Sequence, residues 1–487
     1  MGSYWVLGIR VSTQLLGFLK TFFFANLLFV QDLGVLAIAM MLIEVLEVFF
    51  ETGFDAKLIQ EKGDVGSYLD TAWTVRILRG FVQFLVLYFL APLAASLKVP
   101  PDKVSLTIAV IRSVGVCHLL SSFGNIGILY FQKKLEFQKV FWLKLPPVVV
   151  DLAVSIAVIL FYRSVWGYVF GRIGGVLTQL LVSYLLSPYR PRLVLDWHKV
   201  RELWGFGKWI FGLRVLNFLI SEGDDFFVWG YLGVAPLALY RYAFRFSNMP
   251  ATEISNTLSQ VTFPAFSRIQ DDLPRLRDAY LKVLAVTAFL SFPLGGLIFT
   301  LGPDFVRLFL KADMHPMIPA LQILAIKGVV RAMGSTRGPL FLAMGKPQMQ
   351  WFFQCIRLFF LAVLIYPLTK AWGIAGTALA TVLISVLLSP LGFFLICKWL
   401  HCSVWQLWSP SFIPLVSTLA TSLIIVCGKA LMGFQMTYAM FFGLFLLWLL
   451  CYCGLAYFLD SFSDFGFLKI LKEQFAVLRR RRRAPVQ

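Results

Sequence analysis

Apolar runs of about 20 residues recur from one end of this chain to the other, and they constrain its fold more than any other feature. A helix of that length spans the hydrocarbon core of a bilayer. The sequence is 59% hydrophobic and 14% charged, whereas soluble domains carry roughly 25% charged residues. Because the runs are continuous and do not alternate, they argue against a transmembrane β-barrel. We therefore expect an all-α polytopic membrane protein.

Hydropathy and helix-breaking residues predict about 14 transmembrane helices. The predicted spans are 4–30, 33–59, 70–97, 104–132, 140–162, 164–187, 205–232, 236–266, 278–301, 316–344, 348–369, 372–399, 409–432 and 436–459. If the N-terminus is cytoplasmic, most Lys and Arg outside the spans fall in cytoplasmic loops and in the tail. The positive-inside rule therefore predicts that both termini are cytoplasmic.

An internal repeat divides the predicted helices into two lobes. Residues 5–11 (WVLGIRV) match residues 209–215 (WIFGLRV), and residues 177–188 (LTQLLVSYLLSP) match residues 379–390 (LATVLISVLLSP) at nearly the same offset. Six helices per repeat make the two lobes parallel, as in other parallel-repeat transporters. The predicted domains are an N-terminal lobe (1–187), a cytoplasmic linker (188–204), a C-terminal lobe (205–399), two further helices (400–460) and a basic cytoplasmic tail (461–487).

Three glutamates, Glu44, Glu47 and Glu51, lie inside the predicted span 33–59, where carboxylates are costly. Their i, i+3, i+7 spacing places them on one helix face. With a rise of about 1.5 Å per residue, Arg10 comes level with Glu51, and Lys20 comes level with Glu44 and Glu47. We interpret these residues as ion pairs within the first lobe or as carriers of a coupling proton.

A second set of acids, Glu222, Asp224 and Asp225, comes level with Arg241 and Arg245 on the next predicted span. Arginines without an obvious carboxylate partner remain in both lobes, so a cavity between the lobes would have surplus positive charge. Such a cavity suits a phosphate-bearing substrate, because the guanidinium group binds phosphate with bidentate geometry. The cations predicted to bind substrate charge are Arg10, Lys20, Arg214, Arg241, Arg245 and Arg331.

Other classes of site find little support in the sequence. The seven cysteines form no CxxC pair and the four histidines are scattered, so we expect neither a metal site nor a catalytic residue. No P-loop is present, which argues against ATP as the energy source. The net charge of +19 follows largely from cytoplasmic loops and the arginine run 479–483, which suits anionic lipid headgroups better than nucleic acid.

Several stretches form a characteristic set: GFDAKLIQEKGDV (53–65), LDTAWTVRILRG (69–80), APLAA (91–95), FGKWIFGLRVLNFLISEGDDFFVWGYLG (206–233), LALYRYAFRFSNMPATEI (237–254), FPAFSRIQDD (263–272), GPLFLAMGKP (338–347) and WGIAGTALATVL (372–383). With them the chain resembles the Wzx-type polysaccharide-transport flippases of the multidrug/oligosaccharidyl-lipid/polysaccharide (MOP) exporter superfamily. The similarity is greatest to the lipopolysaccharide and colanic-acid exporter subgroup.

The resemblance implies a 6+6+2 arrangement of helices in the bacterial cytoplasmic (inner) membrane. It implies export of a polyprenyl-pyrophosphate-linked oligosaccharide for surface polysaccharide or lipopolysaccharide biosynthesis, by alternating access through a cationic central cavity. It also implies an ion gradient, of H⁺ or Na⁺, in place of a cofactor. Membrane lipids and the lipid-linked oligosaccharide are the expected partners, and the polysaccharide assembly machinery is a further candidate.

Three alternatives stay open at this point. A cation-coupled multidrug exporter of the same superfamily would need a cavity richer in acids. A lipid II flippase is another alternative within the class of transporters. A membrane glycan ligase or polymerase would place catalytic residues in a large external loop, whereas the longest predicted external loop, 302–315, is short and half apolar.

Overall fold

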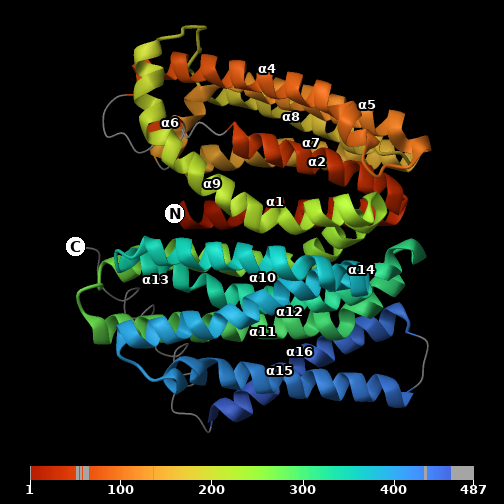
Figure 1. The fold of residues 1–487 in the computed structure, drawn as a ribbon, viewed down its shortest axis with the longest axis vertical. Coiled ribbons are helices and arrows are strands. Elements are labelled where there is room, and N and C mark those ends of the chain that lie inside the picture. The colour runs from red at the N-terminus through yellow and green to blue at the C-terminus, as the bar shows by residue number, and fades with distance from the viewer. Residues whose placement is uncertain are drawn as a thin grey trace. The chain divides into compact units, whose positions relative to one another are not determined.

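A computed structural model describes residues 2–50, 54, 57–58, 65–134, 136–432 and 436–461 of the chain. The chain forms two compact units, Met1–Ala238 and Leu239–Gln487. Within each unit, long helices run side by side along one direction (Figure 1). The predicted linker at 188–204 is defined by the sequence repeat, whereas the two units divide after Ala238. The predicted domain boundaries stay a prediction.

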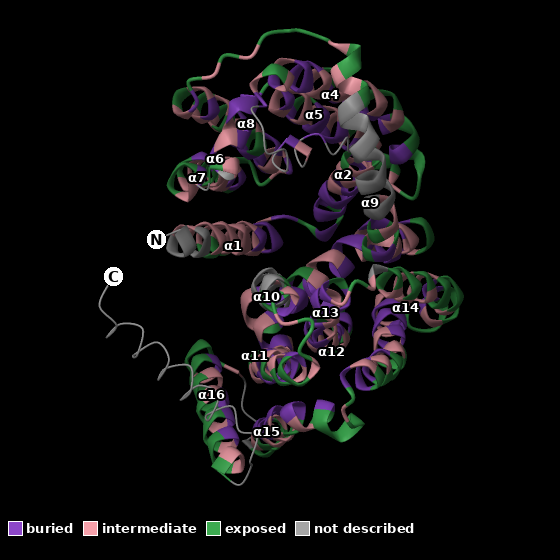
Figure 2. Cartoon of the chain, turned by 90° about the vertical axis from the view of Figure 1, so that its left-hand side faces the viewer, coloured by how far each residue is buried: buried purple, intermediate pink, exposed green. Residues whose placement is uncertain are grey.

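The first unit contains most of the long helices of the N-terminal half. Its elements are α1 (Gly2–Leu27), α2 (Val30–Phe49), α4 (Gly66–Ser96), η1 (Pro101–Lys103), α5 (Val104–Ser122), η2 (Ile126–Ile128), α6 (Leu129–Lys133), α7 (Phe137–Tyr162), α8 (Trp166–Leu186) and α9 (Trp197–Leu232). Most of α2 is buried, as its purple ribbon shows in Figure 2.

The second unit begins within α10 and contains the remaining helices. Its elements are α10 (Val234–Ser267), α11 (Leu273–Phe309), η3 (Ala312–Met317), α12 (Ile318–Ser335), α13 (Arg337–Ala343), α14 (Pro347–Leu400), α15 (Val404–Met432) and α16 (Tyr438–Ser461). The longest element, α14, consists of two helices joined at Trp372 and Gly373, which have non-helical backbone angles. Gly373 has φ +55°, a conformation that glycine adopts without strain. The break confirms the predicted separation of the spans 348–369 and 372–399.

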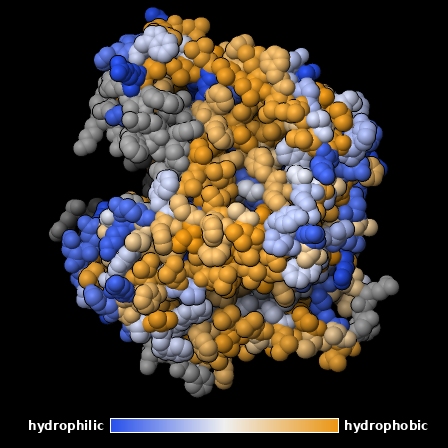
Figure 3. Space-filling view, viewed as in Figure 1, coloured by the Kyte–Doolittle hydropathy of each residue, from blue (hydrophilic) through white to orange (hydrophobic). Residues whose placement is uncertain are grey.

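Nine helices in the described part of the chain are long and apolar enough to cross a membrane, and the joined pair in α14 is one of the nine. Large apolar side chains are exposed along the helix sides; Phe89, Phe161 and Leu185 are examples. Figure 3 shows hydrophobic residues over the flanks of the helices and hydrophilic residues toward their ends. The predicted fold class, an all-α polytopic membrane protein, is confirmed.

Glycines allow the close approach of neighbouring helices in each unit. In unit 1 a Cβ at Gly171 of α8 would lie 2.6 Å from the Asp151 carbonyl oxygen of α7. In unit 2 a Cβ at Gly295 of α11 would lie 2.2 Å from a methyl group of Val329 on α12. Small residues drive helix packing in membranes, because lipid offers no hydrophobic force that pushes helices together.

One predicted span, 104–132, differs from the structure. The helix α5 ends at Ser122, and the chain then forms the short elements η2 and α6. The Asn125 side chain explains the break, because its Oδ1 atom accepts a hydrogen bond from the Gly127 amide at 2.9 Å and its Nδ2 atom donates to the Tyr189 carbonyl at 2.7 Å. A side chain that bonds local backbone in this way competes with continuation of the helix.

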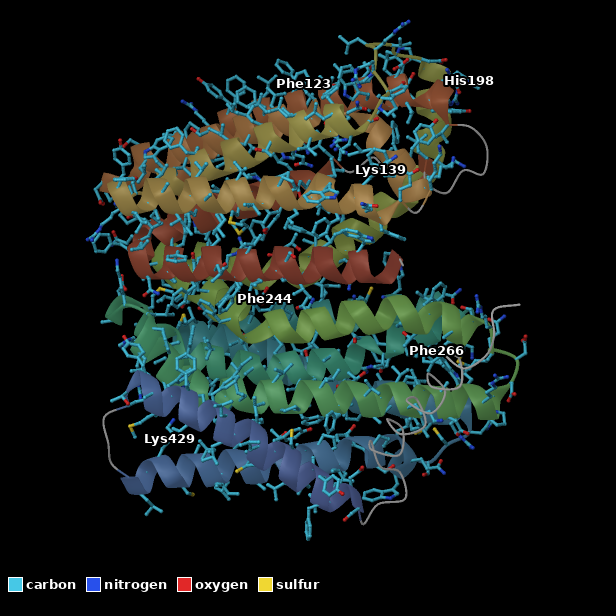
Figure 4. The ribbon with its side chains drawn as sticks, turned by 180° about the vertical axis from the view of Figure 1, so that it is seen from behind. Phe123, Lys139, His198, Phe244, Phe266 and Lys429 are labelled. Carbon is cyan, nitrogen blue, oxygen red and sulfur yellow. The ribbon has the colours of Figure 1, made fainter. Side chains whose placement is uncertain are left out.

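The segment between α8 and α9 is fixed against unit 1 by hydrogen bonds. Asp70 of α4 accepts bonds through one carboxylate oxygen from the Tyr189 hydroxyl at 2.6 Å and from the Arg192 amide at 2.8 Å. The Val194 amide donates to the Thr74 hydroxyl at 3.0 Å. We refer to residues 188–196, held in this way, as the clasp. Figure 4 shows His198, which follows the clasp, at the same end of unit 1 as Lys139.

Candidate functional site

An ion pair joins α1 to α7 inside unit 1. The Lys20 Nζ atom lies 2.7 Å from Oδ1 and 2.8 Å from Oδ2 of Asp151, so one ammonium bonds both oxygens of the carboxylate. The two side chains are 15% and 18% exposed. The same ammonium lies 4.4 Å from the centre of the Tyr168 ring of α8. A charge this enclosed within a spanning helix requires such partners.

The glycines of α8 determine where Asp151 points. Gly171 and Gly175 lie one turn apart and both face Asp151, whose Cβ would be 3.0 Å from a Cβ at Gly175. The Ser155 hydroxyl, one turn further along α7, donates to Asp151 Oδ1 at 3.3 Å. The spacing Gly-x-x-x-Gly thus seats α7 closely on α8, and Asp151 meets Lys20 at the edge of this contact.

A chain of hydrogen bonds links α2, α4 and α5. Gln83 of α4 is 1% exposed, and its Nε2 atom donates to the Leu46 carbonyl of α2 at 3.0 Å. Its Oε1 atom is then the acceptor that faces His118 Nε2 of α5 at 2.8 Å. With this amide orientation His118 must carry a proton on Nε2. Its Nδ1 atom lies 3.8 Å from the Glu47 carboxylate, a distance at which a protonated ring would form an ion pair.

Three arginines lie near His118. Arg76 and Arg79 of α4 and Arg172 of α8 lie close enough to His118 for their charges to act on its ring. Arg76, Arg79 and Gln83 are spaced i, i+3, i+7, so they share one face of α4. Positive charge from two helices, α4 and α8, therefore acts on His118.

The two units each contain further buried charges. In unit 2, Lys327 of α12 is 4% exposed and lies 4.9 Å from the centre of the Phe244 ring of α10. Lys429 of α15 forms an ion pair with Asp304 of α11, which is 6% exposed. In unit 1, Lys103 pairs with Asp32 at 2.9 Å. These pairs attach one helix to another at the end of a span.

The predicted site residues fall on five helices. Arg10 and Lys20 lie on α1, Glu44 and Glu47 on α2, Glu222, Asp224 and Asp225 on α9, Arg241 and Arg245 on α10, and Arg331 on α12. Asp224 and Asp225 are buried, whereas Arg245 and Arg331 are exposed. Glu51 and the side chain of Arg214 lie outside the described residues. Substrate binding and proton coupling by these residues stay predictions.

Sequence reasoning missed the partner that the structure gives Lys20. Residues of adjacent spans that lie at the same depth in the membrane were matched, and this predicts Glu44 or Glu47 as the partner of Lys20. The partner in the structure is Asp151, which lies 131 residues away in the chain. The signal was the lone carboxylate in the apolar run of the predicted span 140–162. An ionisable residue inside a span is by default a sign of function or of a buried partner.

Metal chemistry receives no support from the part of the chain that the structure describes. No group of three or more His, Cys, Asp and Glu side chains there could hold a metal ion. The seven cysteines are all free thiols.

Comparison with known proteins identifies the family of the chain. A family model described as "Polysaccharide biosynthesis protein" matches residues 23–319, which is more than half of the chain. The chain belongs to the polysaccharide biosynthesis protein family. WzxC of Escherichia coli (strain K12), a lipopolysaccharide biosynthesis protein, is 23% identical over 424 residues, and the match covers 85% of each chain. The family resemblance expected from the sequence motifs is thereby confirmed.

Two solved structures share the fold of this family member. The lipid II flippase MurJ in an inward closed conformation superposes with a TM-score of 0.74 at 15% identity, over 93% of this chain and 99% of that chain. An inward-facing MATE family transporter of the MOP superfamily superposes with a TM-score of 0.63 at 15% identity, over 80% of this chain and 94% of that chain. At this identity the likeness establishes the transporter fold and no substrate.

Proposed function

We propose that this polysaccharide biosynthesis protein is a flippase that moves a lipid-linked oligosaccharide across the cytoplasmic membrane of a bacterium. The family match over residues 23–319 is the observation that carries the proposal. The substrate class is a polyprenyl-pyrophosphate-linked oligosaccharide, and the protein acts as a transporter and not as a glycan ligase or polymerase.

The charge distribution inside the membrane supports an anionic substrate. In unit 1 the charges of Arg76, Arg79 and Arg172 act on His118, and Asp151 is already bonded to Lys20 through both oxygens. A cationic drug would be repelled by such an interior, whereas phosphate groups would be attracted by it. The interior would bind the pyrophosphate and sugars while the polyprenyl tail stays in lipid. Alternating exposure of the bound head group to the two sides would complete transport, driven by an H⁺ or Na⁺ gradient.

The distribution of basic residues supports cytoplasmic placement of both termini. Lys139 and His198 lie at one end of unit 1 (Figure 4), where the basic residues Arg190, Arg192 and Lys199 also belong. By the positive-inside rule this end faces the cytoplasm. Reporter fusions that are active only in the periplasm should therefore be silent after residue 196 and active after residue 98.

Complementation tests the proposed function. The chain is expressed in a panel of strains, each of which lacks one flippase for a surface glycan, and the returning glycan is scored by immunoblot. We expect at least one glycan to return. A strain that depends on lipid II transport and a drug-sensitive efflux mutant belong in the panel. If no surface glycan returns and only the strain that depends on lipid II transport is rescued, the protein is a lipid II flippase. If only the drug-sensitive mutant is rescued, the protein is a multidrug exporter.

A further inference from the structure

We propose that Cys397 and Cys402, at the junction of α14 and α15, form a dithiol site that a low-molecular-weight disulfide oxidises to an intramolecular disulfide. Both residues are free thiols in the structure. The site is a thiol modification site within unit 2, and it does not depend on which substrate the protein transports. Closure of the disulfide would tie the start of α15 to the last turn of α14.

The C-terminal cap of α14 brings the two cysteines together. His401 has φ +48° and ψ +49°, the left-handed conformation in which many helices end. The Cys402 amide then donates to the Cys397 carbonyl at 3.1 Å. This hydrogen bond defines a Schellman motif, and the two residues that it joins frequently place their side chains in contact. Residues i and i+5 point away from each other within a helix, but they meet at this helix end.

Backbone geometry allows a disulfide between the two residues. The 3.1 Å hydrogen bond from the Cys402 amide to the Cys397 carbonyl, together with covalent bond lengths, keeps the two Cα atoms within about 7 Å of each other. A disulfide can bridge Cα atoms up to that limit. The Cys402 thiol also donates a hydrogen bond to the Cys397 sulfur. The two sulfur atoms are therefore neighbours before any oxidation.

The N-terminal cap of α15 fixes Cys402 from the other direction. The Ser403 hydroxyl accepts a hydrogen bond from the Gln406 amide at 3.2 Å, and the Ser403 amide donates to Gln406 Oε1 at 3.1 Å. These reciprocal bonds form a capping box, before which an apolar residue often packs on the fourth residue of the helix. Cys402 and Leu407 occupy these two positions and belong to the same apolar cluster. Two caps thus set the position of Cys402.

The two thiols differ in their access to solvent. Cys397 is 8% exposed and belongs to the apolar cluster that contains Phe266, which marks this end of unit 2 in Figure 4. Cys402 is half-buried and packs against the edge of the same cluster. A dissolved oxidant therefore reaches Cys402 first, and Cys397 reacts with Cys402 in the second step.

Oxidised glutathione serves as the disulfide in the proposed reaction. The Cys402 thiol gives its proton to water, and its sulfur attacks one sulfur of oxidised glutathione, whose S–S bond breaks. One glutathione leaves as a thiolate and takes up a proton. The Cys397 thiol loses its proton and attacks the Cys402 sulfur, so that the bond between the two cysteines forms and the second glutathione leaves. Two protein thiols are thereby oxidised, and one oxidised glutathione is reduced to two glutathione molecules.

Burial makes the first step dependent on pH. Burial and the neighbouring Cys397 thiol raise the pKa of Cys402 to about 11, and the positive charge of Arg277 on α11 opposes the shift. Tyr280 of α11 is also close enough to interact with this thiol. Because the thiolate is the attacking species, the rate should rise through pH 9.5 without levelling off. An ordinary thiol with a pKa of roughly 8.5 levels off over this range, and such a profile would overturn the inference.

Mass spectrometry of the full-length protein in nanodiscs tests the site. The protein is incubated with oxidised glutathione, the remaining thiols are blocked with N-ethylmaleimide, and the unfolded chain is digested with trypsin. Lys398 separates the two cysteines in the sequence, so only the disulfide joins the two resulting peptides. We expect the linked peptides in the wild type and their separation after reduction. A wild type that keeps a stable glutathione adduct at Cys402, or that remains unmodified, would overturn the inference.

Serine variants test the order of the two steps. In Cys397→Ser the mixed disulfide of Cys402 with glutathione should persist, whereas in Cys402→Ser the buried Cys397 should stay unmodified. Alanine takes the place of serine if either variant does not fold. The matched control is Cys453→Ser at an exposed position of α16, and it should give the linked peptides as the wild type does. Glutathione on Cys397 in the Cys402 variant would contradict the proposed order.

Substitutions of His401 test whether the cap brings the thiols together. His401→Gly keeps the left-handed conformation without strain and should close the disulfide as fast as the wild type. His401→Val disfavours this conformation, because β-branched residues rarely adopt it. It should slow the second step several-fold, so that the glutathione adduct of Cys402 accumulates. Equal rates of closure in the two His401 variants, with unchanged unfolding midpoints, would overturn the inference.

Discussion

The Lys20 ammonium of α1 lies within 2.8 Å of both carboxylate oxygens of Asp151 on α7, a residue that is 131 positions away in the chain. The pair is enclosed by Tyr168, whose ring centre lies 4.4 Å from the ammonium. Loss of one partner would leave the other charge in a medium that solvates it poorly. The pair therefore determines how α1 attaches to α7.

We expect Asp151→Asn and Lys20→Met each to lower the stability of the protein by about 2 to 3 kcal/mol, somewhat less than the ~3–5 kcal/mol found for fully buried pairs. The unfolding midpoint in detergent measures the effect. The double variant Lys20→Met with Asp151→Leu should recover most of the loss, because neither charge then remains unpaired. Single variants as stable as the wild type would show that the pair does not hold α1 in place.

A prediction for Gly171 follows from the contact of α7 with α8. An alanine Cβ there would lie 1.9 Å from the Ser155 hydroxyl oxygen and 2.6 Å from the Asp151 carbonyl. We expect Gly171→Ala to push the helices apart, to displace Asp151 and to destabilise the protein by about 1 to 3 kcal/mol. Expression yield and the unfolding midpoint measure this effect.

The matched control for this substitution is Gly443→Ala in α16, where nothing lies within 4 Å of an added Cβ. Alanine at an open helical position should be neutral or stabilise by roughly 0.5 to 1 kcal/mol. Equal behaviour of the two alanine variants would rule out a steric requirement at position 171.

Hydropathy predicted the fold class because each span must satisfy its backbone within the bilayer, and long apolar runs do so as helices. Helix-breaking residues predicted the break within α14, where Trp372 and Gly373 interrupt the helix. The break after Ser122 could not be predicted in the same way. It depends on the contact between Asn125 and the Tyr189 carbonyl, which lies 64 residues further along the chain.

From the sequence alone the charged residues inside the spans could be found, but the contacts between them could not. Intramembrane cations indicated an anionic ligand before any geometry was known. The partner of Lys20 was missed because depth matching assumes that neighbours in sequence are neighbours in space, whereas α1 pairs with α7 through Asp151. For the same reason the sequence could not show that Gln83 and His118 meet inside unit 1.

The clasp gives a prediction for protease sensitivity. Asp70 accepts hydrogen bonds from both the Tyr189 hydroxyl and the Arg192 amide. We expect Asp70→Asn and Tyr189→Phe to increase tryptic cleavage after Arg192 several-fold in native protein at pH 8. Asp102→Asn, at an exposed position of η1, is the matched control and should cleave as the wild type does. Equal cleavage in all variants would mean that the hydrogen bonds do not hold the clasp.

The same contact has a defined pH dependence. Burial raises the pKa of Tyr189, and its hydrogen bond to the Asp70 carboxylate raises it further. A raised pKa in the folded state means that the stabilisation is complete below the ordinary tyrosine pKa of roughly 10. It is lost as the pH rises through the higher folded value. Tryptic cleavage of the wild type, corrected for enzyme activity, should therefore stay constant from pH 7 to pH 9.

The pair between Asp304 of α11 and Lys429 of α15 attaches the last two helices of unit 2. Asp304 is 6% exposed, and Lys429 also donates to the Thr300 carbonyl at 3.3 Å. Figure 4 shows Lys429 at the end of unit 2 that lies away from Phe266. Lys429 belongs to the last turn of α15.

We expect Lys429→Met to leave the Asp304 carboxylate buried without its partner and to lower the unfolding midpoint by several degrees. Hydrogen exchange should rise in α15 and α16 while that of α7 and α8 stays unchanged, because α7 and α8 belong to the other unit. Lys370→Met, an exposed lysine in the first helix of α14, is the control for loss of charge alone. If both lysine variants shift the midpoint equally, net charge and not the buried pair accounts for the stability of this end of the unit.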